Sequence, residues 1–232
     1  GCALFWSRRH ERAAGIEPES NHTFAETGAN PVFYIVLAGF SGLAGMGFEV
    51  VGVQILSQVF RDTIFTFANI LGVYLIGTST GAWLYASRIS RRGFSQGTIT
   101  AFCLAGAVVS VLCAAFVLGN SLPIVAVLSP GNGGSMAGHL LAEAALAFMV
   151  FFIPALFMGM IFSNLTGIFN RKGAGVVIGV NTLFSACAPI LFGLYCISTF
   201  GYTVTFYLVP SVYLVLCIAV IIRYHIPVRR FL

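Results

Sequence analysis

The chain has 232 residues, which would suit one ordinary soluble domain, but its composition excludes that class. Hydrophobic residues make up 58% of the chain and charged residues only 8%, whereas soluble proteins carry about 25% charged residues. The mean hydropathy of +0.95 also excludes a disordered chain, and it excludes a nucleic-acid-binding protein despite the net charge of +5. We therefore predict an all-α, polytopic membrane protein whose main partner is the lipid bilayer.

Six apolar segments in chain order fit this class, because a hydrocarbon core about 30 Å thick needs about 20 apolar residues per helix. The segments are apolar all round rather than alternating in polarity, which favours helices over barrel strands. They are Val32–Val53 (open to continuation as far as Phe60), Ile64–Tyr85, Ile99–Leu118, Leu140–Phe162, Ala174–Ile197 and Val204–Ile222. We expect a polar tail (1–31), a six-span transmembrane domain (32–223) and a short basic C-terminus (224–232).

The basic residues predict how these spans are oriented. Eleven of the twelve fall on one side of a six-span arrangement: Arg8, Arg9, Arg12, Arg88, Arg91, Arg92, Arg171, Lys172, Arg223, Arg229 and Arg230. The other side holds Arg61, which is followed directly by Asp62. Because cytoplasmic loops carry the excess of Lys and Arg, both termini are expected in the cytoplasm.

Two acidic residues fall inside predicted spans, where an ionisable group marks a functional hypothesis. Glu49 is deep in the first span, and it is either the charge partner of a bound solute or a protonated carboxyl that bonds another helix. Glu143 lies one turn into the fourth span, with His139 on the same helix face. These two form either a proton-linked pair or an outer pair in contact with water.

Polar and small residues surround Glu49 in the predicted spans. We expect Gln54, Asn181 and Thr182 to contribute to a substrate-binding lining, and the glycines of the first two spans to pack these helices tightly together around Glu49. None of the six cysteines forms a CxxC or has a histidine at ligand spacing, which predicts no metal site. No soluble catalytic motif is visible, so we expect no catalytic residue and no cofactor.

Two stretches, residues 33–84 and 153–194, resemble the membrane portion of the fused transporter-like/spermidine-synthase-like proteins of bacteria. The resemblance covers about half of the chain and depends on the order of four motifs. These are an acidic signature (Phe48-Glu49-Val50-Val51), a G-x-x-x-G pattern (Gly77 to Gly81), a P-x-x-x-M-G-x-x-F segment (Pro154 to Phe162) and a G-x-x-x-x-x-N-T-L segment (Gly175 to Leu183).

The resemblance implies a multi-pass protein of the bacterial inner membrane with a transporter-like design. Gly52 stands where a Trp is common in the family, and the family often continues into an aminopropyltransferase-like domain beyond the position of Leu232. That activity is not implied for these residues. We expect a membrane module that handles a small polar or cationic solute. The alternative is a non-catalytic accessory subunit of a larger membrane complex, paired with other membrane subunits or with a second copy.

Overall fold

The computed structural model describes residues 30–60, 63–90, 95–121, 123, 136–169 and 171–228, and every regular element in these ranges is a helix. The residues from Pro31 onward belong to one compact unit. The expected polar tail lies outside the described residues, apart from its last two. The helices are α2 (Pro31–Phe60), α3 (Thr63–Leu84), η1 (Tyr85–Ile89), α4 (Gln96–Gly119), α6 (Met136–Gly167), α7 (Arg171–Ala188), η3 (Pro189–Cys196) and α8 (Ile197–Val228).

Five helical segments are long and apolar enough to cross a membrane, which makes the chain a polytopic membrane protein. They are Pro31–Gln58, Phe67–Ile89, Gln96–Gly119, Leu141–Gly167 and Gly173–Tyr224. The first four segments correspond to the first four predicted spans. The prediction of an all-α protein is therefore confirmed for the described residues, and the apolar helices indicate contact with a lipid bilayer.

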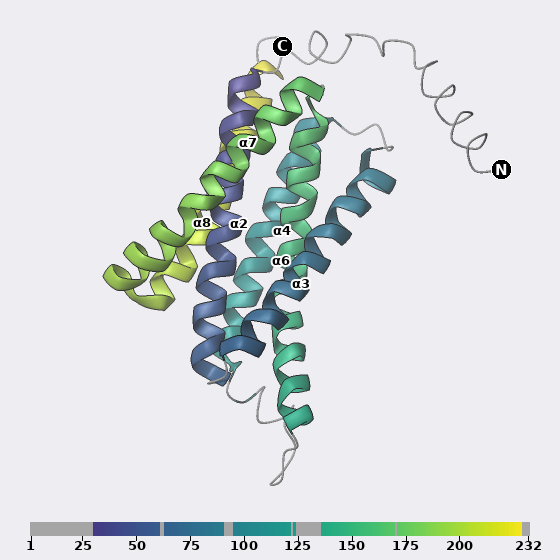
Figure 1. Ribbon diagram of the computed structural model, residues 1–232. Coiled ribbons are helices and arrows are strands. Elements are labelled where there is room, and N and C mark those ends of the chain that lie inside the picture. The colour runs from purple at the N-terminus through teal and green to yellow at the C-terminus, as the bar shows by residue number, and fades with distance from the viewer. Residues whose placement is uncertain are drawn as a thin grey trace, which may run out of the picture. The chain divides into compact units, whose positions relative to one another are not determined.

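The last of the five segments contains the fifth and sixth predicted spans. It is 52 residues long, more than twice the length of about 20 that a bilayer core requires. Gly201 interrupts it with φ 78° and ψ 171°, a backbone conformation that is essentially restricted to glycine. Figure 1 shows α7 and η3 running in one direction and α8 returning in the other. This glycine lies between the fifth and sixth predicted spans, Ala174–Ile197 and Val204–Ile222.

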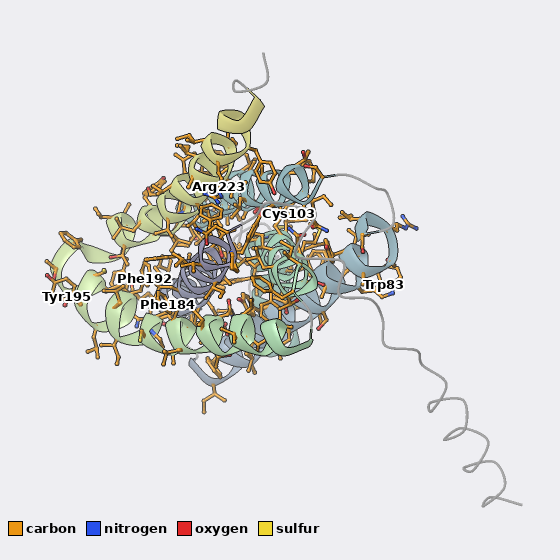
Figure 2. All side chains as sticks on the ribbon, turned by 90° about the horizontal axis from the view of Figure 1, so that it is seen from above. Trp83, Cys103, Phe184, Phe192, Tyr195 and Arg223 are labelled. Atoms are coloured by element: carbon orange, nitrogen blue, oxygen red, sulfur yellow. The ribbon has the colours of Figure 1, made fainter. Side chains whose placement is uncertain are left out.

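Helix α2 is the central element, because it packs against α3, α6, α7 and α8. Figure 2, which looks along the bundle, shows α2 surrounded by the other helices, with Phe184 of α7 and Phe192 of η3 beside it. Phe48 of α2 is fully buried, and its ring centroid is 5.1 Å from that of Phe151 and 5.7 Å from that of Phe206. Such aromatic pairs contribute about 0.5–1.5 kcal/mol each beyond their buried area, so this cluster holds α2, α6 and α8 together.

The glycine-rich helices pair differently from the prediction that α2 and α3 pack together through their glycines. A Cβ at Gly39 of α2 would meet Phe184 and Val180 of α7 at 3.1–3.2 Å. A Cβ at Gly77 of α3 would meet Ala155 of α6 at 2.7 Å. The prediction named the wrong partner helices. Small residues of α2 let α7 approach closely, and those of α3 let α6 approach closely. Periodicity shows that a helix has a small-residue face but not which helix will occupy it.

The start of α2 lies against the end of α8. The Tyr34 and Tyr224 hydroxyls form a hydrogen bond of 2.6 Å, and the Arg223 guanidinium lies 5.1 Å from the Phe33 ring centroid. The Tyr224 ring also lies against Gly97, in the first turn of α4. We call this end of the bundle the terminal face. The beginning of α2, the beginning of α4 and the end of α8 are fastened together there.

Candidate functional site

Glu49 is enclosed in the helix bundle. Its side chain is only 5% exposed. It lies on α2 directly after Phe48, the residue at the centre of the aromatic cluster. Among the described residues it makes no hydrogen bond and no ion pair. A carboxylate in such surroundings is costly unless a cation, a proton or water satisfies it, so a positive charge beside Glu49 is favoured.

Two tyrosine hydroxyls converge one helical turn before Glu49. A Cβ at Gly45 would lie 3.4 Å from the Tyr213 hydroxyl oxygen and 3.5 Å from that of Tyr74. Tyr213 is fully buried and its hydroxyl donates to the Ser41 carbonyl oxygen at 3.1 Å. The Tyr74 hydroxyl is close enough to Glu49 for the two groups to interact electrostatically. The absence of a side chain at Gly45 therefore leaves room for two hydroxyls from α3 and α8 beside the α2 carboxyl.

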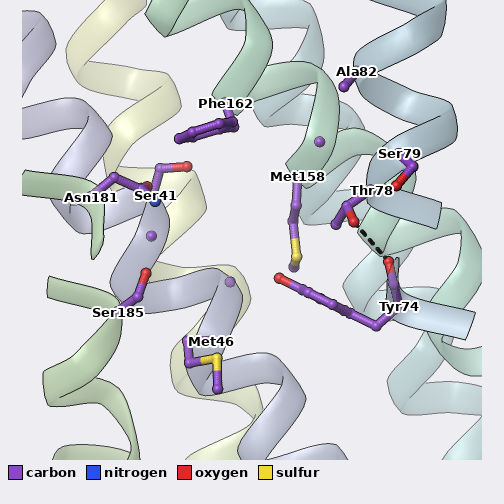
Figure 3. A pocket seen from close by; sticks show the side chains of 13 residues that line it. Ser41, Met46, Tyr74, Thr78, Ser79, Ala82, Met158, Phe162, Asn181 and Ser185 are labelled. Carbon is purple, nitrogen blue, oxygen red and sulfur yellow. Dashed lines mark hydrogen bonds between the residues drawn. The ribbon is translucent and has the colours of Figure 1, made fainter. Parts of the chain in front are cut away.

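A pocket of about 350 Å³ adjoins this cluster (Figure 3). It is formed by α2, α3, α6 and α7, four helices that are distant in the sequence. Its lining residues are Ser41, Gly42, Gly45, Met46, Tyr74, Thr78, Ser79, Ala82, Met158, Gly159, Phe162, Asn181 and Ser185. The volume falls within the range of about 300–1,000 Å³ that is typical of small-molecule sites.

The polar groups of the pocket lie on two opposite walls. Asn181 and Ser185 of α7 lie with Ser41 of α2 on one side, while Tyr74, Thr78 and Ser79 of α3 lie on the other (Figure 3). Met158 and Phe162 of α6 provide apolar surface between the two walls. The Thr78 hydroxyl donates to the Tyr74 carbonyl oxygen at 3.0 Å, so its lone pairs remain available to a ligand. The pocket thus suits a small solute with both polar and apolar parts.

The four residues predicted to bind substrate occupy three different surroundings. Asn181 lines the pocket, and Glu49 lies one turn beyond the pocket residue Gly45. The Gln54 side chain faces η3, since its Nε2 would lie 3.5 Å from a Cβ at Gly193. Thr182 is exposed, and its hydroxyl donates to the Ile178 carbonyl oxygen of the same helix at 2.9 Å. The structure therefore brings Glu49 and Asn181 to one region and directs Thr182 away from it.

The second predicted pair lies elsewhere. Glu143 is 3% exposed on α6 and precedes the pocket residue Met158 by about four helical turns, or about 22 Å of helix axis. The side chain of His139 lies outside the described residues, so the proposed proton-linked pair stays a prediction. Among the residues that the structure describes, no group of three or more His, Cys, Asp or Glu side chains could hold a metal ion.

The sequence interpretation did not identify Ser41, Tyr74 and Ser185 as part of the site. A signal for one of them was present, because Asn181 and Ser185 are four residues apart and so share one helix face. Tyr74 carried no comparable signal. Its role depends on which face of α3 meets α2, and that is a property of the packed bundle.

Comparison with known protein families, curated proteins and solved structures finds no match to this chain. The class of protein that the fold defines is a multi-pass membrane protein with a pocket between its helices. What the pocket binds has to be inferred from its own residues.

Proposed function

We propose that the chain is a transporter-like module of the bacterial inner membrane that binds a small polar or cationic solute in this pocket. The supporting observation is the enclosed Glu49 carboxyl, which has no partner among the described residues. At the centre of a membrane helix a charged side chain costs about 3 kcal/mol, and a bound cationic group would recover part of that cost. The expected resemblance to the membrane half of the synthase-fused proteins agrees with this proposal and remains a prediction.

In this proposal the cationic end of the solute lies toward Glu49, and its apolar part contacts Met158 and Phe162. The hydroxyls of Tyr74 and Tyr213, directed to the space beside Gly45, accept hydrogen bonds from the cationic group. The Asn181 amide binds a polar group at the opposite end of the pocket. Binding is selective because both the carboxyl and the amide are left without a partner when a purely apolar molecule enters.

We further propose that the chain crosses the membrane six times with both termini in the cytoplasm. The reversal at Gly201 supports two crossings within the last helical segment. The hydrogen bond between Tyr34 and Tyr224 supports an even number of crossings, because it joins the first and last helices at one end. The same end carries Arg223, in agreement with the positive-inside rule.

The experiment that tests the solute proposal uses the purified chain in lipid nanodiscs and a panel of radiolabelled primary and quaternary alkylammonium ions. At least one member should bind the wild-type chain with saturation. Asn181→Leu should weaken that binding at least about tenfold, since it removes a buried hydrogen-bond partner of the ligand. Thr182→Val is the matched control on the next residue, and it should bind as the wild type does because Thr182 points away from the pocket. Equal effects of the two substitutions would contradict the assignment.

One observation favours the alternative, an accessory subunit of a larger membrane complex. Gly175 and Gly179 form an exposed G-x-x-x-G pair on α7, and a Cβ at either position meets nothing within 4 Å. Small residues of this kind let another membrane helix approach closely. Under this alternative, extraction in mild detergent brings the chain out with a stoichiometric partner, and Gly179→Leu releases that partner. Extraction as a monomer that still binds an alkylammonium ion favours the first proposal.

A further inference from the structure

A second polar region lies where η1, α4 and α6 meet, separate from the pocket. We call it the α4–α6 junction and define it by Tyr85, Gln96, Thr100 and Asn164. It is near the terminal face, because Gly97, next to Gln96, contacts the Tyr224 ring. None of its members lines the pocket, and none was predicted as a site residue.

A hydrogen-bond chain fixes the orientation of the Asn164 side-chain amide. The Thr100 hydroxyl donates its one proton to the Gln96 carbonyl oxygen at 2.7 Å. The atom of Asn164 that lies 2.7 Å from the same hydroxyl must therefore be a donor, which is Nδ2. The Oδ1 atom consequently points elsewhere. It has no hydrogen-bond partner in the described chain, although Asn164 is 0% exposed.

One more buried oxygen in the junction lacks a partner among the described residues, Gln96 Oε1. The Gln96 side chain lies beside the Tyr85 hydroxyl, and that hydroxyl would lie 3.5 Å from a Cβ at Gly167. Gln96 is one turn before Thr100 on α4, and Gly167 is about one turn after Asn164 on α6. The Gln96 and Asn164 oxygens are therefore in adjacent layers of the same helix contact. A buried acceptor without a partner costs about 1–3 kcal/mol, so an occupant is expected.

The chemistry of the junction selects what the occupant can be. Both oxygens are amide carbonyls, which can only accept. Helix α6 ends at Gly167, and η1 continues α3 to Ile89, so two helix C-termini place partial negative charge here. No carboxylate belongs to the junction, whereas Mg²⁺ and Ca²⁺ sites normally include one. Arg88 is exposed, where water and salt screen its charge.

We propose that the α4–α6 junction is a binding site for a monovalent cation, represented by Na⁺, with Asn164 Oδ1 and Gln96 Oε1 as its ligands. Helix C-terminal ends and neutral oxygens are the groups that coordinate Na⁺ in membrane transporters. The insertion of a π-helical turn, η1, next to the site agrees with this role, because such turns occur frequently at functional sites. The proposal does not depend on the solute pocket.

The test measures thermal unfolding of the purified chain in detergent, in NaCl and in N-methylglucamine chloride of equal ionic strength. Once Na⁺ exceeds its dissociation constant, the Tm should rise by about 3–6 °C for each tenfold increase in Na⁺. Asn164→Leu should abolish this rise. In N-methylglucamine it should unfold no earlier than the wild type, because leucine leaves no buried acceptor without a partner. If that variant does not fold, Gln96→Leu replaces it with the same expected loss of response.

Two control variants show whether Na⁺ acts at this junction or at another place on the chain. Ser110→Ala removes a buried hydroxyl of the same helix that is bonded to the Ala107 carbonyl oxygen, and it should keep the full Na⁺ response. Glu49→Gln should also keep it, which excludes Na⁺ binding in the pocket region. An identical wild-type Tm in the two salts would mean that water alone occupies the junction and would overturn the proposal. A Na⁺ response that persists in both Asn164→Leu and Gln96→Leu would overturn it as well.

Discussion

Gly77→Ala is predicted to destabilise the protein, because α3 and α6 touch at this glycine. A Cβ there would lie 2.7 Å from the Ala155 Cβ and 2.9 Å from the Phe152 carbonyl oxygen. Relaxed distances are about 3.5–4.0 Å between carbons and about 3.3 Å from carbon to oxygen, so the two helices must separate by close to 1 Å. Neither obstructing atom is the end of a flexible side chain, so side-chain rotation cannot relieve the contact.

The expected cost follows from two opposing terms. Overpacking costs about 1–3 kcal/mol, and replacing a helical glycine by alanine returns up to about 1 kcal/mol of helix propensity. Gly72→Ala on the same helix is the matched control, because a Cβ there meets nothing within 4 Å. It keeps the propensity gain without the clash. The two variants should therefore differ by about 2 kcal/mol, with Gly77→Ala the less stable.

Thermal unfolding in one detergent, followed by circular dichroism, measures this difference. For a protein of this size, about 2 kcal/mol corresponds to a Tm difference of about 4–8 °C. Gly81→Ala should behave like Gly77→Ala, because its Cβ would collide with the Leu156 carbonyl group. Equal unfolding temperatures for the Gly72 and Gly77 variants would refute the close approach of α3 and α6.

Three further predictions concern other contacts. Gly42→Ala should weaken solute binding, because its Cβ would displace the polar ends of Asn181 and Ser185. The Tm should fall by no more than a few degrees. A binding isotherm measures the affinity, and an unchanged affinity would count against the pocket. Tyr34→Phe and Tyr224→Phe should each lower the free energy of unfolding by about 1 kcal/mol. The double variant should lower it little further, because each of the three variants loses the same hydrogen bond of 2.6 Å. Additive costs in that double-mutant cycle would show that the two hydroxyls do not interact. Finally, all six cysteines of the sequence are replaced and a single cysteine is placed at Tyr202, beside the turn at Gly201. This cysteine should react with a membrane-impermeant thiol reagent from outside intact cells. Labelling only after lysis would contradict the six-crossing proposal.

The sequence was sufficient for the helical segments and insufficient for the site. Segment lengths follow from hydropathy alone, and for this reason the first predicted span, open to Phe60, agrees with α2 ending at that residue. The break between the fifth and sixth predicted spans falls at 198–203, and Gly201 lies within it. The hydrophobic content of a segment determines whether it can lie in lipid, and this property depends only on the residues of that segment.

The pocket depends on which helix faces meet, and that pairing involves residues far apart in the sequence. Asn181 and Thr182 were grouped because they are adjacent, but neighbouring residues of a helix point about 100° apart. Asn181 consequently lines the pocket while Thr182 is exposed. Glu49 was identified correctly as a residue within an apolar helix. Its proximity to Tyr74 required α2 and α3 to be packed in their actual register.

Binding of an alkylammonium ion by the Glu49→Gln variant tests the central claim most directly. Glutamine keeps the size of the side chain and removes its charge, so the fold and the Tm should be preserved. A solute that binds through the Glu49 carboxylate should lose at least about tenfold in affinity, since charged hydrogen-bonding partners contribute about 1.5–3 kcal/mol. Equilibrium binding in nanodiscs measures this loss. Wild-type affinity in a folded Glu49→Gln variant would contradict the account.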